Sequence, residues 1–143
     1  MIDIVVQAAE NFCIHQIRSE FISQKPEQKP LDKTVLAYID VTTTNGVVYR
    51  TYIGCNESMN RLLTKIFLDE DDSCDDSLMD MLLETTNMIV GSAKVVAQKE
   101  YQVSMDISTP FLADEDVCDT LNLDDSHCIR INDSYLAIAT KRL

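Results

Sequence analysis

Several residue types that common catalytic sites depend on are scarce in this chain of 143 residues. It has three glycines, two histidines and no tryptophan. The glycines are far apart, which excludes phosphate-cradling glycine loops and dinucleotide-binding fingerprints. His15 and His127 lie in no local ligand spacing, so a packed or surface histidine is favoured over a histidine triad or metal site. An enzyme built from this chain has to work with carboxylates and amides.

Basic residues are also few. Twelve lysines and arginines face 24 acids, giving a net charge of −12. Phosphate backbones and acidic membrane surfaces are bound by clustered Lys and Arg, so both partners are disfavoured. The chain begins MIDIVVQAAENF, without a basic n-region, and no apolar run is long enough for a signal or a spanning helix. We expect a cytoplasmic protein with no nucleic-acid or membrane partner.

Cysteine use gives no disulfide framework. The five cysteines are an odd number at wide spacing, without a C-x-x-C pair, at positions Cys13, Cys55, Cys74, Cys118 and Cys128. We expect reduced and mostly buried thiols; a metal or redox role is the weaker alternative.

Length and composition, with 45% hydrophobic and 25% charged residues, predict one folded domain over residues 1–143. Apolar periodicity predicts helices at 2–22, 57–68 and 77–98, the second capped by Asn56. Predicted strands are 34–42 and 47–53, joined through Thr44-Asn45-Gly46; 101–109, ending at Pro110; and 128–131 and 135–140, joined through residues 132–134. The last strand is nearly all apolar, which indicates burial on both faces. The pattern predicts an α+β fold, a mainly antiparallel sheet with long helices packed on one side.

Two acidic stretches allow more than one interpretation. Asp69, Asp71 and Ser73 have the spacing of a calcium loop, but Cys74 stands where glycine is needed and Asp80 where glutamate is needed. A solvated turn is favoured, with its last acids at the positive end of the next helix and Ser73 or Ser77 as the cap. Residues 113–125 are either one helical turn or a loop anchored by apolar side chains.

The helix at 77–98 organises the chain. At roughly 100° per residue, Asp80, Glu84, Asn87 and Gly91 fall within about 60° of each other and form one polar stripe. The predicted core face is about 100° wide and is flanked by Leu78, Ile89 and Val96. It comprises Met79, Leu82, Leu83, Thr86, Val90, Ala93 and Ala97.

Two methionines lie on the side of the stripe away from this predicted core face. Met81 and Met88 suit either an adaptable protein contact or a wider core or dimer contact.

The stripe reads D-x3-E-x2-N from Asp80 through Glu84 to Asn87, and Pro110 follows after 22 intervening residues. With these elements, and with ETTNMIVGSAK around them, the chain resembles the CheC/CheX family of chemotaxis phosphatases, whose pattern is D/S-x3-E-x2-N-x22-P. The order of elements resembles the family over nearly the whole chain. One copy of the motif is visible, because Glu10 and Asn11 of the first helix are adjacent, so the resemblance is to single-site, CheX-like members.

The resemblance implies a CheC-like fold and a phosphatase that hydrolyses the aspartyl phosphate of a CheY-type response regulator in chemotaxis or two-component signalling. It implies Asn87 and Glu84 as the catalytic pair, Asn87 orienting water and Glu84 pairing with a lysine of the regulator. Asp80, Gly91 and Pro110 are supporting positions.

Each supporting position has its own interpretation. Asp80 is interpreted as setting the helix start, Gly91 as allowing close approach of another backbone, and Pro110 as shaping the turn after its strand.

The chain is expected to need no cofactor or metal of its own, since the Mg²⁺ belongs to the regulator's site. A homodimer is compatible with the resemblance. The runner-up is a non-catalytic CheX-like dimerisation or adaptor domain.

Overall fold

A seven-stranded antiparallel sheet forms the frame of the computed structural model, which describes residues 1–25, 34–69, 74–114 and 125–143. Strands follow the order β1-β6-β7-β3-β2-β4, and β5 also pairs with β2. Their bounds are β1 (Ile22–Gln24), β2 (Val35–Thr43), β3 (Val48–Cys55), β4 (Met105–Ile107), β5 (Phe111–Leu112), β6 (Ser126–Ile131) and β7 (Ser134–Arg142). The long central strands β2, β3 and β7 carry the core, and the short strands lie at the edges.

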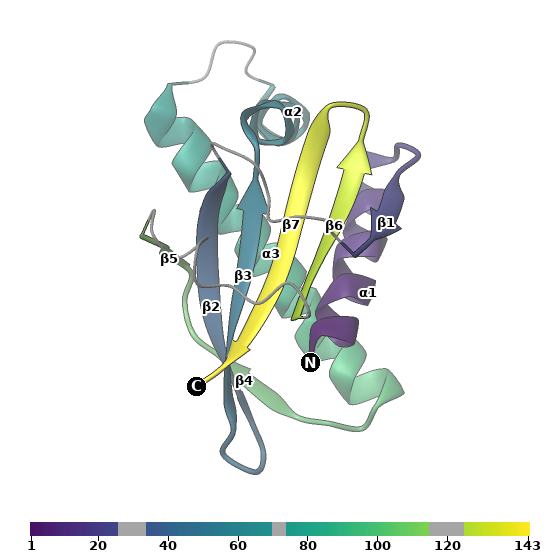
Figure 1. Ribbon diagram of the computed structural model, residues 1–143, viewed down its shortest axis with the longest axis vertical. Coiled ribbons are helices and arrows are strands. Elements are labelled where there is room, and N and C mark those ends of the chain that lie inside the picture. Colours follow the sequence, from purple (N-terminus) through teal and green to yellow (C-terminus); the bar gives the residue numbers. More distant parts are fainter. Residues whose placement is uncertain (26–33, 70–73, 115–124) are drawn as a thin grey trace.

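The helices cover one face of this sheet (Figure 1). They are α1 (Ile2–Phe12), continued by the π-helical turn η1 (Cys13–Ile17), α2 (Glu57–Leu68) and α3 (Asp75–Glu100). The long α3 packs against α1, α2 and strands β2, β3 and β4. The α+β class and the placement of helices on one side are therefore confirmed. No helix of the described residues combines the length and the apolar character needed to cross a membrane.

The β2–β3 hairpin forms where the sequence predicts it. Thr43 N donates to Val47 O at 2.9 Å and Gly46 N donates to Thr43 O at 2.9 Å, which closes a three-residue loop. Gly46 has φ +85°. A left-handed residue at the end of such a loop is the usual solution for right-twisted strands, and glycine adopts it without steric cost.

The first helix is shorter than predicted. Instead of running to residue 22, it changes to a π turn at Cys13 and ends at Arg18, which has φ 61°. The chain then forms β1, an edge strand in which Ile22 pairs with Arg130 of β6. The apolar spacing continues through the π turn, so periodicity alone hides the end of the helix.

The predicted strand at 101–109 is also shorter, because β4 covers only Met105–Ile107. Tyr101 caps α3, and Gln102 has φ 56°, so the chain turns before it can pair with β2. Alternating side chains at 101–104 indicated a strand, but they lie in this turn. Pro110 separates β4 from β5, as a residue without an N–H does between short edge strands.

The core lies between α3, α1 and the central strands. The buried residues of α3 are Leu78, Met81, Leu82, Thr85, Thr86, Ile89, Val90, Ala93 and Ala97. Compared with the predicted core face, this face is turned by about 50° around the helix. Met81 is 3% exposed and belongs to the core, whereas Met79 and Leu83 are half-buried. Met81 lies outside the predicted core face, and of its two interpretations the wider core face is confirmed, because α1, α2 and the sheet together bury a wider arc of α3 than one neighbour would.

The C-terminal strand is buried on both faces, as predicted. Leu136 and Ile138 join the core beneath the helices, while Ala139 packs with Leu36 and Tyr52 on the opposite face. The β6–β7 turn is Asn132-Asp133, with Asn132 at φ 53°.

The acidic stretch before α3 is described only in part, because residues 70–73 lie outside the described residues. Cys74 is the N-cap of α3 and makes no side-chain cap hydrogen bond. Ser77 lies inside the first turn, so its predicted capping role is wrong. Asp75 and Asp76 do occupy the first turn, where the helix dipole favours carboxylates. For the stretch 113–125, positions 115–124 are likewise outside the described part.

Four cysteines fall within the described residues, and all four are free thiols. Cys13, Cys55 and Cys128 are buried and Cys74 is exposed, as the prediction of mostly buried thiols requires. Burial raises the pKa of both Cys13 and Cys55 to about 12, which keeps these two thiols protonated and unreactive. Cys118 lies outside the described residues.

Candidate active site

The three acidic and amide side chains of the polar stripe are exposed on α3. Asp80, Glu84 and Asn87 follow each other at four- and three-residue steps, so they lie one above another on the face opposite the core. Among the described residues, none of the three has a hydrogen bond or ion pair to another side chain or to the backbone. Their polar atoms are therefore available to a partner molecule.

The face of α3 opposite the stripe is packed into the core. Leu82 and Ile89 are fully buried, and so are Thr85 and Thr86, which stand between Glu84 and Asn87. The Thr86 hydroxyl donates to Leu82 O at 2.8 Å and so needs no partner outside the helix. A carboxylate and an amide fixed on a packed helix keep their spacing when a partner binds, which favours a preorganised site.

Asp80 does not mark the start of the helix. It is the sixth residue of α3, which begins at Asp75, and the first-turn acids are Asp75 and Asp76. Stabilisation by the helix dipole falls off within the first turn. The interpretation of Asp80 as a helix-start residue is therefore wrong, and its exposed carboxylate belongs to the stripe.

The two other supporting positions differ from each other. A Cβ built on Gly91 meets nothing within 4 Å among the described residues, so within this part of the chain no other backbone approaches it closely. Pro110 lies between β4 and β5, which both pair with β2 and both contact α3. It follows β4 directly in the chain, and its role in shaping the turn there stays a prediction.

Met88 is half-buried beside Asn87 and packs against the core cluster. Its position supports a wider core face rather than an exposed contact, although part of the side chain remains accessible.

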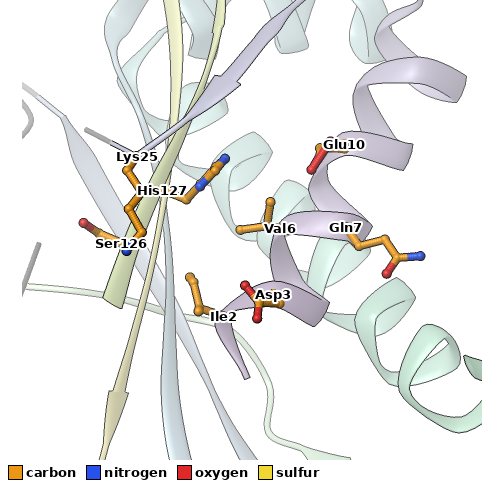
Figure 2. A pocket seen from close by; sticks show the side chains of 8 residues that line it. All are labelled: Ile2, Asp3, Val6, Gln7, Glu10, Lys25, Ser126 and His127. Carbon is orange, nitrogen blue, oxygen red and sulfur yellow. The ribbon is translucent and has the colours of Figure 1, made fainter. Parts of the chain in front are cut away.

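A second polar group surrounds a pocket between α1 and β6, with a volume of about 450 Å³. Figure 2 shows His127 projecting from β6 toward α1, while Asp3 and Glu10 direct their carboxylates at the same cavity. The Ser23 hydroxyl lies 2.7 Å from His127 Nε2 and links β1 to β6. Partial burial lowers the pKa of His127, and the carboxylates of Glu10 and Asp3 offset part of that shift.

This pocket has the residue types of a Ser-His-acid triad but not its connections. Ser23 is the one hydrogen-bond partner of the His127 side chain among the described residues. No carboxylate there orients the second ring nitrogen, as a triad requires. No three His, Cys, Asp or Glu side chains of the described chain are grouped so that they could hold a metal ion.

The sequence does contain a signal for the α1 side of this pocket. Asp3, Gln7 and Glu10 repeat the spacing of Asp80, Glu84 and Asn87, with the carboxylate and the amide exchanged. Gln7 points away from the pocket (Figure 2), and its Nε2 donates to Glu100 Oε2 at 2.7 Å. Unlike Glu84, Gln7 therefore already has a partner within the chain.

Comparison with known proteins gives a family match over the part of the chain that carries the α3 stripe. The family model described as "Chemotaxis phosphatase CheX" matches residues 37–132, a range that contains Asp80, Glu84, Asn87, Gly91 and Pro110 and leaves α1 outside. No curated protein sequence matches significantly.

Solved structures of the same fold cover nearly the whole chain. The chemotaxis protein CheX from Vibrio vulnificus has 16% identity and a TM-score of 0.70, covering 97% of both chains. A CheC-like chemotactic protein from Shewanella oneidensis has 13% identity and a TM-score of 0.70, covering 97% of this chain and 96% of its own. CheX from Borrelia burgdorferi, solved in a complex with CheY, BeF3 and Mg²⁺, has 16% identity and a TM-score of 0.67, covering 98% of this chain and 97% of its own. These matches establish the shared fold, and together with the family model they show that the chain belongs to the CheX family of chemotaxis phosphatases.

Proposed function

We propose that residues 1–143 act as a single CheX-like domain that accelerates hydrolysis of the aspartyl phosphate of a CheY-type response regulator in chemotaxis or two-component signalling. The observation that carries the proposal is the pair Glu84 and Asn87, exposed and without intramolecular partners on a rigidly packed helix. Such a pair has no structural task in the fold, and its chemistry fits the activity of the family.

The reaction is attack of water on phosphorus. A new oxygen–phosphorus bond forms while the bond to the aspartate oxygen breaks, the aspartate leaves as a carboxylate, and the water releases a proton to solvent on becoming phosphate. Most of the catalytic effect in such a transfer comes from positioning and electrostatics. A carboxamide neither gains nor loses a proton at neutral pH, yet it donates and accepts hydrogen bonds. Asn87 is therefore suited to hold the water in line behind phosphorus.

Glu84 is assigned to docking. It lies one turn before Asn87, and its carboxylate has no partner among the described residues. A lysine in the regulator's site would form a charge-assisted pair with it and so fix the position of α3 relative to the phosphoryl group. Asp80, one turn further, adds negative charge on the same stripe.

The proposal requires no cofactor or metal in this chain. CheX from Borrelia burgdorferi was solved with CheY, BeF3 and Mg²⁺, and we assign the Mg²⁺ of the present reaction to the regulator's own site. There the cation would neutralise the charge on the phosphoryl oxygens, and Asn87 would orient the water. A cytoplasmic place of action follows from this substrate, and a homodimer is compatible with it.

A phosphate-release time course tests the proposal. A CheY-type regulator is phosphorylated with a small acyl phosphate donor, the donor is removed, and phosphate is measured with and without this protein. Faster release with the protein is the expected result. If the protein binds the phosphorylated regulator but leaves the rate unchanged, it is a non-catalytic adaptor instead. If it neither binds nor accelerates, the stripe is a solvated helix face and the proposal fails.

A further inference from the structure

Two of the three glycines are explained by the fold itself. Gly46 has φ +85° in the β2–β3 turn, a conformation that other residues rarely adopt. Gly54 lies in β3, where an added Cβ would collide with Leu36 Cδ2 and lie 2.8 Å from Thr34 Cγ2. Both positions therefore favour glycine for reasons within this fold.

Neither a positive φ nor a steric collision explains the glycine at position 91. It lies in the interior of α3 with an ordinary helical φ, and an added Cβ would meet nothing within 4 Å. Glycine in a helix interior is less favourable than any residue except proline, since it loses the most backbone freedom on folding. Gly91 therefore destabilises the helix, and no neighbouring group of this fold needs the space that a side chain would fill. We infer that this space serves another molecule.

The position of Gly91 shows where that room lies. It is four residues C-terminal to Asn87, about 6 Å further along the axis, and within the same polar stripe. Side chains of an α-helix lean toward its N-terminus and cover the turn before their own Cα. A side chain at position 91 would therefore lean over the surface beside the Asn87 amide.

We propose that Gly91 is a positioning residue of the phosphatase site, leaving open the surface through which the phosphoryl-bearing loop of the regulator reaches the backbone of α3 beside Asn87. This inference rests on the proposed function. In this proposal, α3 fits the regulator because Gly91 has no side chain, in addition to the polar contacts of Glu84 and Asn87.

The prediction is that stability and activity change in opposite directions. Gly91→Ala should raise the melting temperature, because alanine favours the helix and its Cβ meets no neighbour. The same variant should lower kcat/KM for phosphate release. Gly91→Leu, whose side chain reaches toward Asn87, should lower it by roughly tenfold or more, as overpacking of a close contact does. Its affinity for the regulator loaded with Mg²⁺ and beryllofluoride should fall in parallel.

Gln98→Leu is the matched control. Gln98 is exposed on the same side of α3, about 10 Å beyond Gly91, so this variant adds the same leucine and should leave phosphate release within twofold of the wild type. Circular dichroism establishes that each variant is folded. If Gly91→Leu is folded and as active as the wild type, or if Gln98→Leu loses as much activity, the inference is overturned while the proposed function stands. If the wild type itself does not accelerate release, the proposed function fails first.

Discussion

Replacing Glu84 should separate docking from folding. The Glu84 carboxylate is exposed and has no hydrogen bond or ion pair among the described residues. Truncation to alanine therefore removes no internal contact, and the free energy of unfolding should change by less than about 0.5 kcal/mol. In the complex, the same truncation leaves a lysine of the regulator without its partner, which costs about 2 kcal/mol or more. This corresponds to roughly a thirtyfold loss of affinity.

The assay is titration of a fluorescently labelled regulator, loaded with Mg²⁺ and beryllofluoride, against wild type, Glu84→Ala and Glu84→Gln. Both variants should bind at least tenfold more weakly than the wild type, and their affinity should depend less on salt, because screening acts on the lost charge pair. Asp80→Ala removes a second carboxylate one turn earlier on the same stripe and should lower the affinity by no more than about threefold, as loss of an exposed charge does. Affinity of Glu84→Ala within twofold of the wild type would refute the role assigned to Glu84.

Two further predictions concern the scaffold. Asn56 Oδ1 accepts from Met59 N at 2.9 Å and from Tyr135 N at 3.0 Å, while Nδ2 donates to Asp133 O at 2.9 Å. Asn56→Ala should therefore lower the free energy of unfolding by about 2 to 3 kcal/mol in urea, and Asn56→Asp by about 1 kcal/mol; a loss below about 0.5 kcal/mol for alanine would contradict this. The lowered pKa of His127 means that the unfolded chain takes up a proton before the folded chain does. Stability from this residue is thus lost as pH falls below about 6.5, and the urea midpoint should fall more from pH 7.5 to about 5.5 in wild type than in His127→Gln. Equal pH dependence of the two would be contrary to this account.

Local signals in the sequence were sufficient for the central elements of the fold. Asn45-Gly46 between two β-rich runs predicted the β2–β3 hairpin, and Asn56 before an amphipathic run predicted the start of α2. In both cases, the residue that determines the turn or the helix cap lies within a few positions of the element that ends or begins there. The nearly all-apolar run of β7 likewise indicated a strand that is buried on both faces.

The predictions from sequence were wrong where the local structure depends on contacts with distant parts of the chain. β1 exists because it pairs with β6, more than 100 residues away, and nothing local distinguishes Ile22 from the end of a helix. The burial of Met81 depends on how many neighbours surround α3, which helical periodicity does not contain. For Asp80, the helix begins two residues before the predicted position, so a carboxylate taken for the first turn lies in the second.

The candidate site was easier to predict from the sequence than the structure around it. Glu84 and Asn87 share a face at any helical register, so their common face followed from spacing, and its exposure followed from the apolar residues on the opposite side of the helix. The Ser23–His127 contact was not foreseeable, because it depends on the pairing of β1 with β6, which lie more than 100 residues apart in the sequence.

The most direct test of the account is phosphate release from the phosphorylated regulator with Asn87→Ala. Asn87 is exposed and without a partner among the described residues, and alanine favours helices, so the variant should retain the wild-type circular dichroism spectrum and melting temperature. Loss of one preorganised polar group in such a site typically lowers the rate by about 10² or more. Release with this variant should therefore be close to the spontaneous rate of the regulator alone. Acceleration equal to that of the wild-type protein would contradict it.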